Sequence, residues 1–193
     1  MASEALTMIV NLLRSQRPLQ EPTVEQMRAG LEAMAQMSPL PADVELTTVD
    51  AGGVPGAWVR VPESDPARVV LYLHGGGYVI GSIRTHRDLA QRIARAARCR
   101  VLLIDYRLAP EHPHPAAVED STRACRWLLE TGSYPKRMAI AGDSAGGGLT
   151  VATLVALRDA GVPLPAAAVC LSPWVDLEGI GESMTTKAAV DPM

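Results

Sequence analysis

The chain has 193 residues, of which 48% are hydrophobic and 20% are charged, and its net charge is −3. Such a chain is long enough for one domain with its own hydrophobic core, and its acidic balance argues against a nucleic-acid partner. It contains no run of about 20 apolar residues, which a membrane-spanning helix would need.

Two helices are predicted at the N-terminus, over residues 3–15 and 23–37, because apolar side chains recur there at helical spacing. Prolines punctuate these helices, at Pro18, Pro22, Pro39 and Pro41. The first residues include Glu4 and no basic run, so we expect no secretory signal peptide. We interpret residues 1–42 as an N-terminal helical cap segment and residues 43–193 as an α/β domain.

Strands and helices are predicted to alternate through the rest of the chain. Apolar runs typical of strands cover residues 44–49, 57–61, 69–73, 101–106, 138–141 and 167–171. Helices are expected over residues 85–97, 116–130 and 145–159. The turn at Gly52 and Gly53 favours a hairpin for the first two strands. The alternation after it favours a mostly parallel sheet with flanking helices and a site at the carboxyl ends of the strands.

Two sets of residues that could indicate other functions have simpler interpretations. The arginines between Arg84 and Arg100 are spread around the predicted helix 85–97, which favours a solvated helix face over a phosphate-binding surface. The three cysteines, Cys99, Cys125 and Cys170, show neither paired nor metal-type spacing. They predict reduced thiols and therefore a cytoplasmic location.

The most informative motif is Gly142-Asp143-Ser144-Ala145-Gly146, which joins the predicted strand 138–141 to the predicted helix 145–159. A serine at such a sharp strand-to-helix turn is typical of a nucleophile elbow, which exposes the hydroxyl for attack. The two glycines allow a close backbone approach that any side chain would block. The helix that follows directs its free N–H groups and the positive end of its dipole toward the same point.

A second motif, His74-Gly75-Gly76-Gly77, follows the predicted strand 69–73. When a serine attacks an ester carbonyl, the carbonyl oxygen becomes negative, and each fixed N–H donor aimed at it lowers the barrier by about 3–4 kcal/mol. Consecutive glycines let the backbone itself supply such donors. The alternative, a merely flexible loop, fits less well, because the glycines lie between a buried type of strand and the apolar segment 78–80.

Three segments, His74–Gly77, Asp105–Pro113 and Gly142–Gly147, carry a family resemblance. Together they resemble the hormone-sensitive-lipase family of microbial carboxylesterases, within the α/β-hydrolase superfamily. The resemblance runs from about residue 44 through the final Asp191-Pro192-Met193. It implies an α/β-hydrolase fold that is incomplete at its C-terminus, with the N-terminal helices forming part of a mobile cap.

The resemblance also implies a function and its residues. It indicates a serine carboxylesterase that hydrolyses small to medium acyl esters through an acyl-enzyme at Ser144. The oxyanion-hole donors that it implies are the backbone N–H groups of Gly76, Gly77 and Ala145.

The triad of this superfamily follows the chain order serine, acid, histidine. All four histidines of this chain precede Ser144, namely His74, His86, His112 and His114. None of the later acids matches the position of the family's triad acid, namely Asp159, Asp176, Glu178, Glu182 and Asp191. We therefore expect the triad acid and base to be absent from this chain. If the rest of the family's fold is absent from the molecule, the last strand is expected to be an exposed sheet edge. Loss of triad members costs on the order of 10⁴–10⁶ in rate.

The upstream histidines are not expected to replace the missing base. His74 is expected to hold the glycine loop by hydrogen bonding, and His86 to open a helix. His112 and His114 are expected in an extended, proline-punctuated run over residues 110–115. Side chains diverge along an extended run and further ligands are missing, so we expect no metal and no other cofactor.

Several alternatives stay open at this stage. A ligand-binding homologue without turnover is one, since plant gibberellin receptors resemble this family and keep the glycine loop and the serine. An inactive fragment is another, and an amidase or an acyltransferase could use the same scaffold. The expected partner is a small-molecule ester, and a homo-oligomer is possible.

Overall fold

The computed structural model describes residues 3–15 and 22–188 of the chain. The segment Asp191-Pro192-Met193, with its expected acid Asp191, lies outside the described residues. The strands are β1 (Glu45–Asp50), β2 (Pro55–Arg60), β3 (Asp65–Leu73), β4 (Cys99–Ile104), β5 (Met138–Asp143) and β6 (Ala167–Leu171). The helices are α1 (Glu4–Ser15), α2 (Val24–Gln36), α3 (Ile83–Ala97), α4 (Ala116–Glu130), α5 (Ala145–Asp159), α6 (Glu182–Thr186) and the 3-10 helix η1 (Pro135–Arg137).

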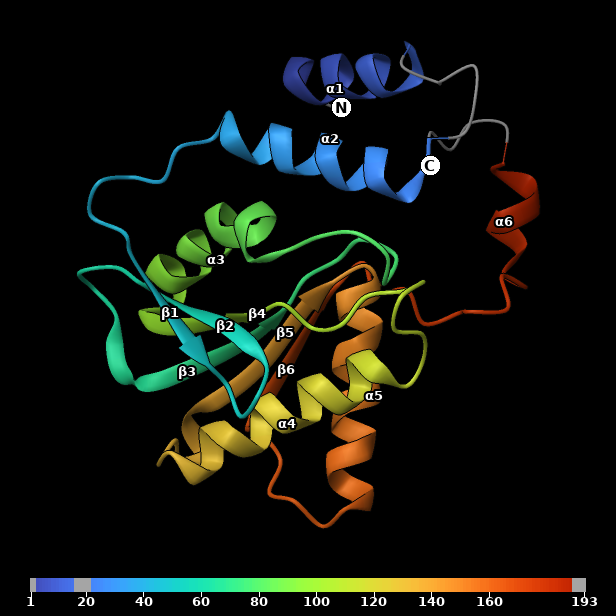
Figure 1. The fold of residues 1–193 in the computed structure, drawn as a ribbon. Coiled ribbons are helices and arrows are strands. Elements are labelled where there is room, and N and C mark those ends of the chain that lie inside the picture. Colours follow the sequence, from blue (N-terminus) through green and yellow to red (C-terminus); the bar gives the residue numbers. More distant parts are fainter. Residues whose placement is uncertain (1–2, 16–21, 189–193) are drawn as a thin grey trace.

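The strands form a single sheet in the order β1-β2-β4-β3-β5-β6 (Figure 1). β1 and β2 are antiparallel, which confirms the hairpin expected at Gly52 and Gly53, and β2 runs antiparallel to β4. The pairs β3–β4, β3–β5 and β5–β6 are parallel, as expected for βαβ units. The carboxyl ends of β3 and β5 therefore lie side by side, and these two strands lead into the glycine loop and the serine motif.

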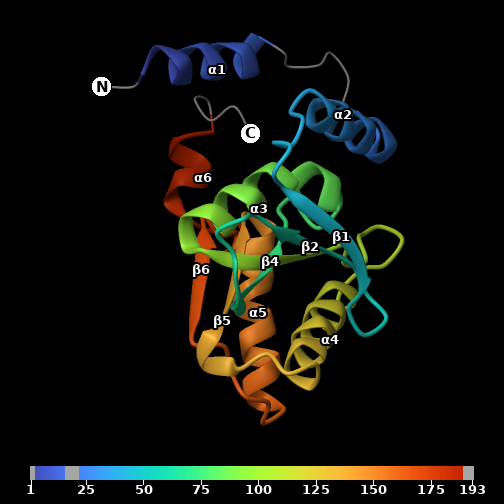
Figure 2. The same cartoon turned by 90° about the vertical axis from the view of Figure 1, so that its left-hand side faces the viewer.

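Helices cover both faces of the sheet. Because successive side chains of a strand point to opposite faces, β3 contributes Leu71 and Leu73 to one core cluster and Val70 and Tyr72 to another. The first cluster also contains residues of α4 and α5, and the second contains residues of α3. Figures 1 and 2 show the same layers, with α3 on one side of the sheet and α4 and α5 on the other. This is the predicted α/β-hydrolase architecture.

The helix α2 packs on the surface of the α/β body. It begins with a capping box, in which the Thr23 hydroxyl accepts from the Gln26 N–H and the Gln26 side chain accepts from the Thr23 N–H. It lies over α3 (Figure 2), but none of its side chains is fully buried. The boundary expected at residues 42 and 43, between a cap segment and an α/β domain, stays a prediction.

The structure tests two predictions about the α/β domain, one on its arginines and one on its cysteines. The arginines from Arg84 do not all lie around a helix, because α3 ends at Ala97, and Arg100 lies in β4 with its guanidinium 4.3 Å from the Trp58 ring centroid. The pairing of β4 with β3 explains the difference, since Cys99 and Arg100 already pair with Asp65 and Val69 just after the helix. The cysteines are free thiols, as predicted; Cys99 and Cys125 are buried and Cys170 is half-buried.

The strand β6 is the last strand of the sheet, and its side chains are mostly exposed. Val169 and Leu171 keep 48% and 40% of their surface accessible. The exposed sheet edge expected from the sequence is therefore present among the described residues.

Candidate active site

The serine motif forms a sharp turn between β5 and α5. Ser144 has φ 52° and ψ −120°, a conformation that is costly for a residue with a side chain and that persists only where its surroundings enforce it. A Cβ at Gly142 would lie 2.2 Å from the Gly146 carbonyl oxygen, and a Cβ at Gly146 would lie 2.0 Å from the Leu73 carbonyl oxygen. Both glycines are therefore required by backbone packing, and Ser144 occupies the predicted elbow.

Backbone hydrogen bonds hold the elbow in place. The Ser144 N–H donates to the Leu171 carbonyl at the end of β6 (2.9 Å). The Ser144 carbonyl accepts from Gly148 N–H (3.1 Å) and from Trp174 N–H (2.9 Å). The elbow is thus held by three backbone hydrogen bonds, one within α5 and two to the end of β6 and the segment after it, which leaves the side chain of Ser144 free of that task.

The glycine loop begins at the end of β3 and turns back on itself. Gly76 and Gly77 have φ 122° and 62°, values that favour glycine. The Gly76 carbonyl accepts from the N–H groups of Val79 (3.0 Å) and Ile80 (2.9 Å), which closes the turn. A Cβ at Gly76 would lie 2.2 Å from the Ile80 carbonyl oxygen, so this turn can form only with glycine at that position.

Asp143, the residue before the serine, ties the two motifs together. Its Oδ1 accepts from Gly75 N–H (3.0 Å) and from the Tyr72 hydroxyl (2.9 Å), and it lies 3.6 Å from His86 Nε2. Burial by itself would raise the pKa of Asp143, but the interactions with His86, Tyr72 and Gly75 outweigh burial and hold the pKa below its usual range. The carboxylate therefore stays charged as a bridge between the loop and the elbow.

His74 supports the glycine loop through a contact with the Gly75 backbone. It is almost fully buried, its ring stacks on Tyr106 with centroids 4.2 Å apart, and its Nδ1 lies 2.8 Å from the Gly75 carbonyl oxygen. The Tyr106 hydroxyl donates to the His74 carbonyl (2.6 Å). Burial lowers the pKa of His74 to about 4, so the ring is neutral at neutral pH. These contacts agree with the hydrogen-bonding role expected from the sequence.

The expected oxyanion donors have free hydrogen-bonding capacity. Among the described residues, no side-chain or backbone acceptor takes the N–H groups of Gly76, Gly77 or Ala145. Ala145 opens α5, where a helix leaves its first N–H groups without intrahelical partners. The half-buried Ser144 likewise makes no side-chain hydrogen bond within the described part of the chain.

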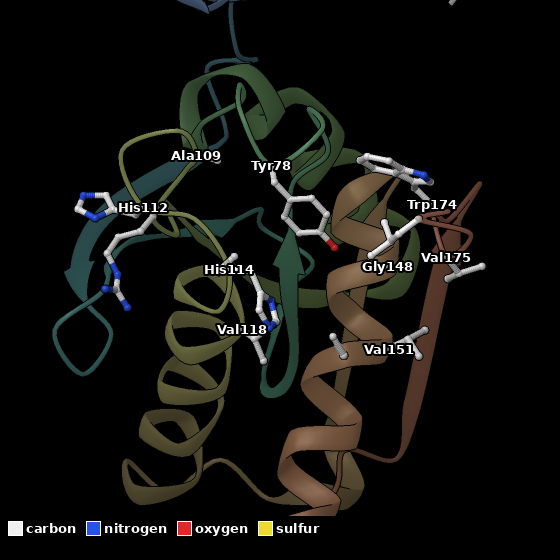
Figure 3. A pocket seen from close by; sticks show the side chains of 13 residues that line it. Tyr78, Ala109, His112, His114, Val118, Gly148, Val151, Trp174 and Val175 are labelled. Atoms are coloured by element: carbon white, nitrogen blue, oxygen red, sulfur yellow. The ribbon is translucent and has the colours of Figure 1, made fainter. Parts of the chain in front are cut away.

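A pocket of about 590 Å³ adjoins the elbow (Figure 3). Tyr78 and Trp174 stand at its upper end with ring centroids 6.2 Å apart, and Gly148 lies one helical turn after Ser144. Its walls are largely apolar and come from α4, α5 and the segment after β6: Ala117, Val118, Val151, Ala152, Val175 and Leu177. The sequence patterns did not predict the walls of this pocket, although the aromatic residue Tyr78, which lines it, directly follows the glycine loop.

His112 and His114 line this pocket, and among the described residues neither is hydrogen-bonded to Ser144. The expectation of an extended run over residues 110–115 was wrong, because His112 N–H donates to the Leu108 carbonyl (2.8 Å) and Ala116 N–H to the Pro113 carbonyl (3.1 Å). Turn hydrogen bonds thus replace the extended path. Figure 3 shows His114 beside Val118, and His112 farther from the centre of the pocket.

His86 lies at the start of a helix, as expected, but the helix begins slightly earlier than predicted. The helix α3 starts at Ile83, capped by Ser82, so His86 lies within its first turn. Its Nδ1 lies 2.8 Å from the Thr85 hydroxyl, and its ring is 5.3 Å from the His74 ring. The contact between His86 and Asp143 joins residues far apart in the chain, and only the pairing of the strands reveals it.

Two of the acids after Ser144, Asp159 and Asp176, make local contacts. Asp176 accepts from the N–H groups of Gly179 (3.1 Å) and Gly181 (2.9 Å), and Asp159 pairs with Arg158 (2.8 Å). In residues 3–15 and 22–188, no group of three or more His, Cys, Asp or Glu side chains could hold a metal ion. Each helix in these ranges is too short or too polar to cross a lipid bilayer.

Comparisons with known proteins agree with this geometry. A family model of the alpha/beta hydrolase fold matches residues 70–193. An acetyl-hydrolase of Streptomyces hygroscopicus is 47% identical over 193 residues, which cover 98% of this chain and 63% of that protein. An ethyl acetate hydrolase of Pseudomonas putida is 43% identical over 122 residues, which cover 60% of this chain and 38% of that protein.

The structure also resembles solved structures of esterases. A crystal structure of an esterase from the bacterial hormone-sensitive lipase family matches with a TM-score of 0.93 and 52% identity, covering 100% of this chain and 65% of that one. The chain thus spans less than two thirds of the length of these relatives. From the motifs, the fold and these matches together, the chain belongs to the α/β-hydrolase family and, within it, is related to the hormone-sensitive-lipase esterases.

Proposed function

We propose that the full-length protein is a serine carboxylic ester hydrolase that acts through an acyl-enzyme at Ser144. The observation that carries this proposal is the strained backbone of Ser144 at the N-terminus of α5, beside a glycine loop that is joined to the elbow through Asp143. A strained serine between free N–H groups is the arrangement that acyl transfer requires. The esterase names of the relatives support the same reaction.

In the proposed mechanism, the Ser144 oxygen attacks the acyl carbonyl carbon while its proton passes to a general base. The carbonyl oxygen becomes negative and accepts hydrogen bonds from the N–H groups of Gly76, Gly77 and Ala145. Collapse of this intermediate breaks the ester bond, and the alcohol leaves with the proton. Water then attacks the acyl-enzyme in the same way, which releases the carboxylic acid and restores the serine hydroxyl.

The general base and its acid partner are proposed to come from residues of the full-length protein that follow this chain. This assignment rests on the triad order of the superfamily, in which the histidine comes last. It agrees with the observation that Ser144 has no histidine partner among the described residues.

The proposed substrates are esters with small to medium acyl chains. Two relatives are named an acetyl-hydrolase and an ethyl acetate hydrolase, and both names indicate a short acyl group. The apolar walls of the pocket beside the elbow suit the hydrocarbon part of such esters. The free cysteines support a cytoplasmic location, and a homo-oligomer is compatible with the proposal.

The test uses the full-length protein with a fluorophosphonate and with p-nitrophenyl acetate, butyrate and octanoate. We expect one adduct on Ser144, ester hydrolysis by the unmodified protein, and loss of both in Ser144→Ala. The loss of rate should be on the order of 10⁴-fold or more. A protein that takes up the ester without turnover, or that carries the adduct on another residue, would contradict the proposal and favour a ligand-binding role.

A further inference from the structure

Arg28 of α2 is the residue that connects this helix to the glycine loop. Its Nε donates to the Val79 carbonyl (2.8 Å), and one terminal nitrogen donates to the Ala109 carbonyl (3.0 Å). Both terminal nitrogens also donate to Glu111, one to each carboxylate oxygen, at 2.8 Å. A planar guanidinium can make this set of contacts, whereas a lysine ammonium presents a single point of charge.

The two loops that Arg28 holds are also joined to each other. The Ala109 N–H donates to the Tyr78 carbonyl (2.9 Å), so the segment after the glycines lies against the segment around Glu111. Val79 belongs to the turn whose N–H groups bind the Gly76 carbonyl. A displacement of the Val79 carbonyl therefore moves the turn that contains Gly76 and Gly77.

The rest of α2 offers little other attachment. No side chain of α2 is fully buried, and Met34 keeps 68% of its surface accessible. Besides Arg28, the polar attachment of α2 comes from Glu32, which binds the Ser82 hydroxyl and pairs with Arg84 at 3.5 Å. The contacts of Glu32 reach α3 and its cap, whereas those of Arg28 reach the glycine loop.

The charges of the Arg28–Glu111 pair persist over a wide pH range. The hydrogen bonds from Arg28 lower the pKa of Glu111 to about 2, and Glu111 in turn raises the pKa of Arg28 above its usual value. Both groups are therefore expected to be charged at neutral pH.

We infer that Arg28 is a positioning residue, which couples the docking of α2 to the placement of the oxyanion donors Gly76 and Gly77. The inference rests on the proposed function, because it assigns Arg28 to the same site. When α2 is docked, the Val79 carbonyl and the Glu111 loop are fixed together, and the turn between them is held in its active geometry. When Arg28 is lost, this turn gains freedom while the elbow is unchanged.

The test compares Arg28→Gln, Arg28→Lys and Glu111→Gln with the matched control Arg84→Gln in the full-length protein. The control removes the ion pair between Arg84 of α3 and Glu32 of α2, which does not touch the glycine loop. Each variant is measured for kcat and KM on p-nitrophenyl butyrate and for amide hydrogen exchange in residues 76–81. Circular dichroism shows whether each variant is folded.

We expect kcat to fall about tenfold or more in Arg28→Gln with KM within about twofold, because misplaced oxyanion donors affect the transition state most. Amide exchange in residues 76–81 should accelerate in the same variant. Glu111→Gln and Arg28→Lys should show the same pattern to a smaller extent, and Arg84→Gln should match the wild type. If Arg28→Gln fails to fold, the other two variants decide the question.

Three results would overturn the inference. One is an unchanged kcat and unchanged exchange in folded Arg28 variants, and another is an equal loss in Arg84→Gln, which would indicate general attachment of α2. The third is a wild-type kcat and wild-type exchange in Arg28→Lys, which would show that the several contacts of the guanidinium are not required. A wild-type protein without esterase activity would instead contradict the proposed function, and the exchange measurement would still test the coupling.

Discussion

The elbow and the helix α2 both contact the glycine loop, but the forces that hold them differ. At the elbow, backbone atoms pack so closely that Gly142 and Gly146 leave no room for a Cβ. In α2, Gly30 has nothing within 4 Å of its Cβ position, and the helix is attached by the ionised side chains of Arg28 and Glu32 together with half-buried apolar side chains such as Leu31. The elbow therefore has little freedom to change its geometry, whereas we expect α2 to be held less firmly.

This difference suits a hydrolase site. The nucleophile and its donors need a fixed geometry, because small displacements reduce transition-state stabilisation. If α2 is part of a cap, as the sequence predicts, it must yield for substrate to enter and product to leave, and contacts between exposed charges allow this. Four changes test the contrast, in order of decreasing effect.

Gly146→Ala should have the largest effect. Its Cβ would lie 2.0 Å from the Leu73 carbonyl oxygen and 2.5 Å from that of His74, so both β3 and the elbow would have to shift. We expect a loss of more than about 3 kcal/mol in the free energy of unfolding, or failure to fold. Urea unfolding followed by circular dichroism measures this. A variant with near wild-type stability would show that the elbow packing is not rigid.

Asp143→Ala should come next, because it removes the bridge between the elbow and the glycine loop. The buried Tyr72 hydroxyl and the Gly75 N–H would lose their acceptor, which costs about 1–3 kcal/mol in the free energy of unfolding. Ester hydrolysis should fall as well, since the loop loses one of its anchors. The control Asp159→Ala removes an exposed pair with Arg158 and should change neither quantity much. Equal effects in both variants would argue against the bridge.

His74 should make stability depend on pH. Its pKa is about 4 in the folded protein and 6.5 ordinarily, so between these values the unfolded chain binds a proton that the folded chain does not. The free energy of unfolding should fall by up to about 1.4 kcal/mol per pH unit as the pH decreases from about 6.5 to about 4. Above pH 6.5 this contribution to stability is fully present.

The check is urea unfolding at several pH values for the wild type and for His74→Asn. The variant should show a shallower decline over this window, whatever its stability at neutral pH. Parallel curves for the two proteins would exclude His74 as the source of the acid sensitivity.

Gly30→Ala should have the smallest effect, and of the opposite sign to Gly146→Ala. Gly30 lies in α2 with open space around its Cβ position, so alanine favours the helix by about 0.5–1 kcal/mol. Because α2 is only attached to the body, the gain should appear as slower amide exchange in α2, with little change in global unfolding. A destabilised variant would indicate that α2 packs more tightly than its exposed side chains suggest.

Local patterns in the sequence were sufficient to predict much of the fold and the site. The strands and helices follow from apolar periodicity, and the elbow follows from glycines at fixed distances from Ser144, because steric limits on the backbone act over a few residues. The roles of Ser144, Gly76, Gly77 and Ala145 as catalytic groups stay proposals, which the labelling experiment tests. The turns at residues 110–115 were missed, because the prolines were interpreted as imposing an extended path, whereas local hydrogen bonds such as that from His112 N–H to the Leu108 carbonyl fold the segment into turns.

The sequence by itself determined which segments become strands and helices, and where a serine and a glycine run stand at the ends of β5 and β3. Only the tertiary structure decided that these two strands are neighbours, that Asp143 reaches Gly75 and His86, and that Arg28 reaches Val79 and Glu111. The physical reason is the range of the interactions. Backbone conformation depends on nearby residues, whereas contacts between residues dozens of positions apart exist only after the sheet has brought their strands together.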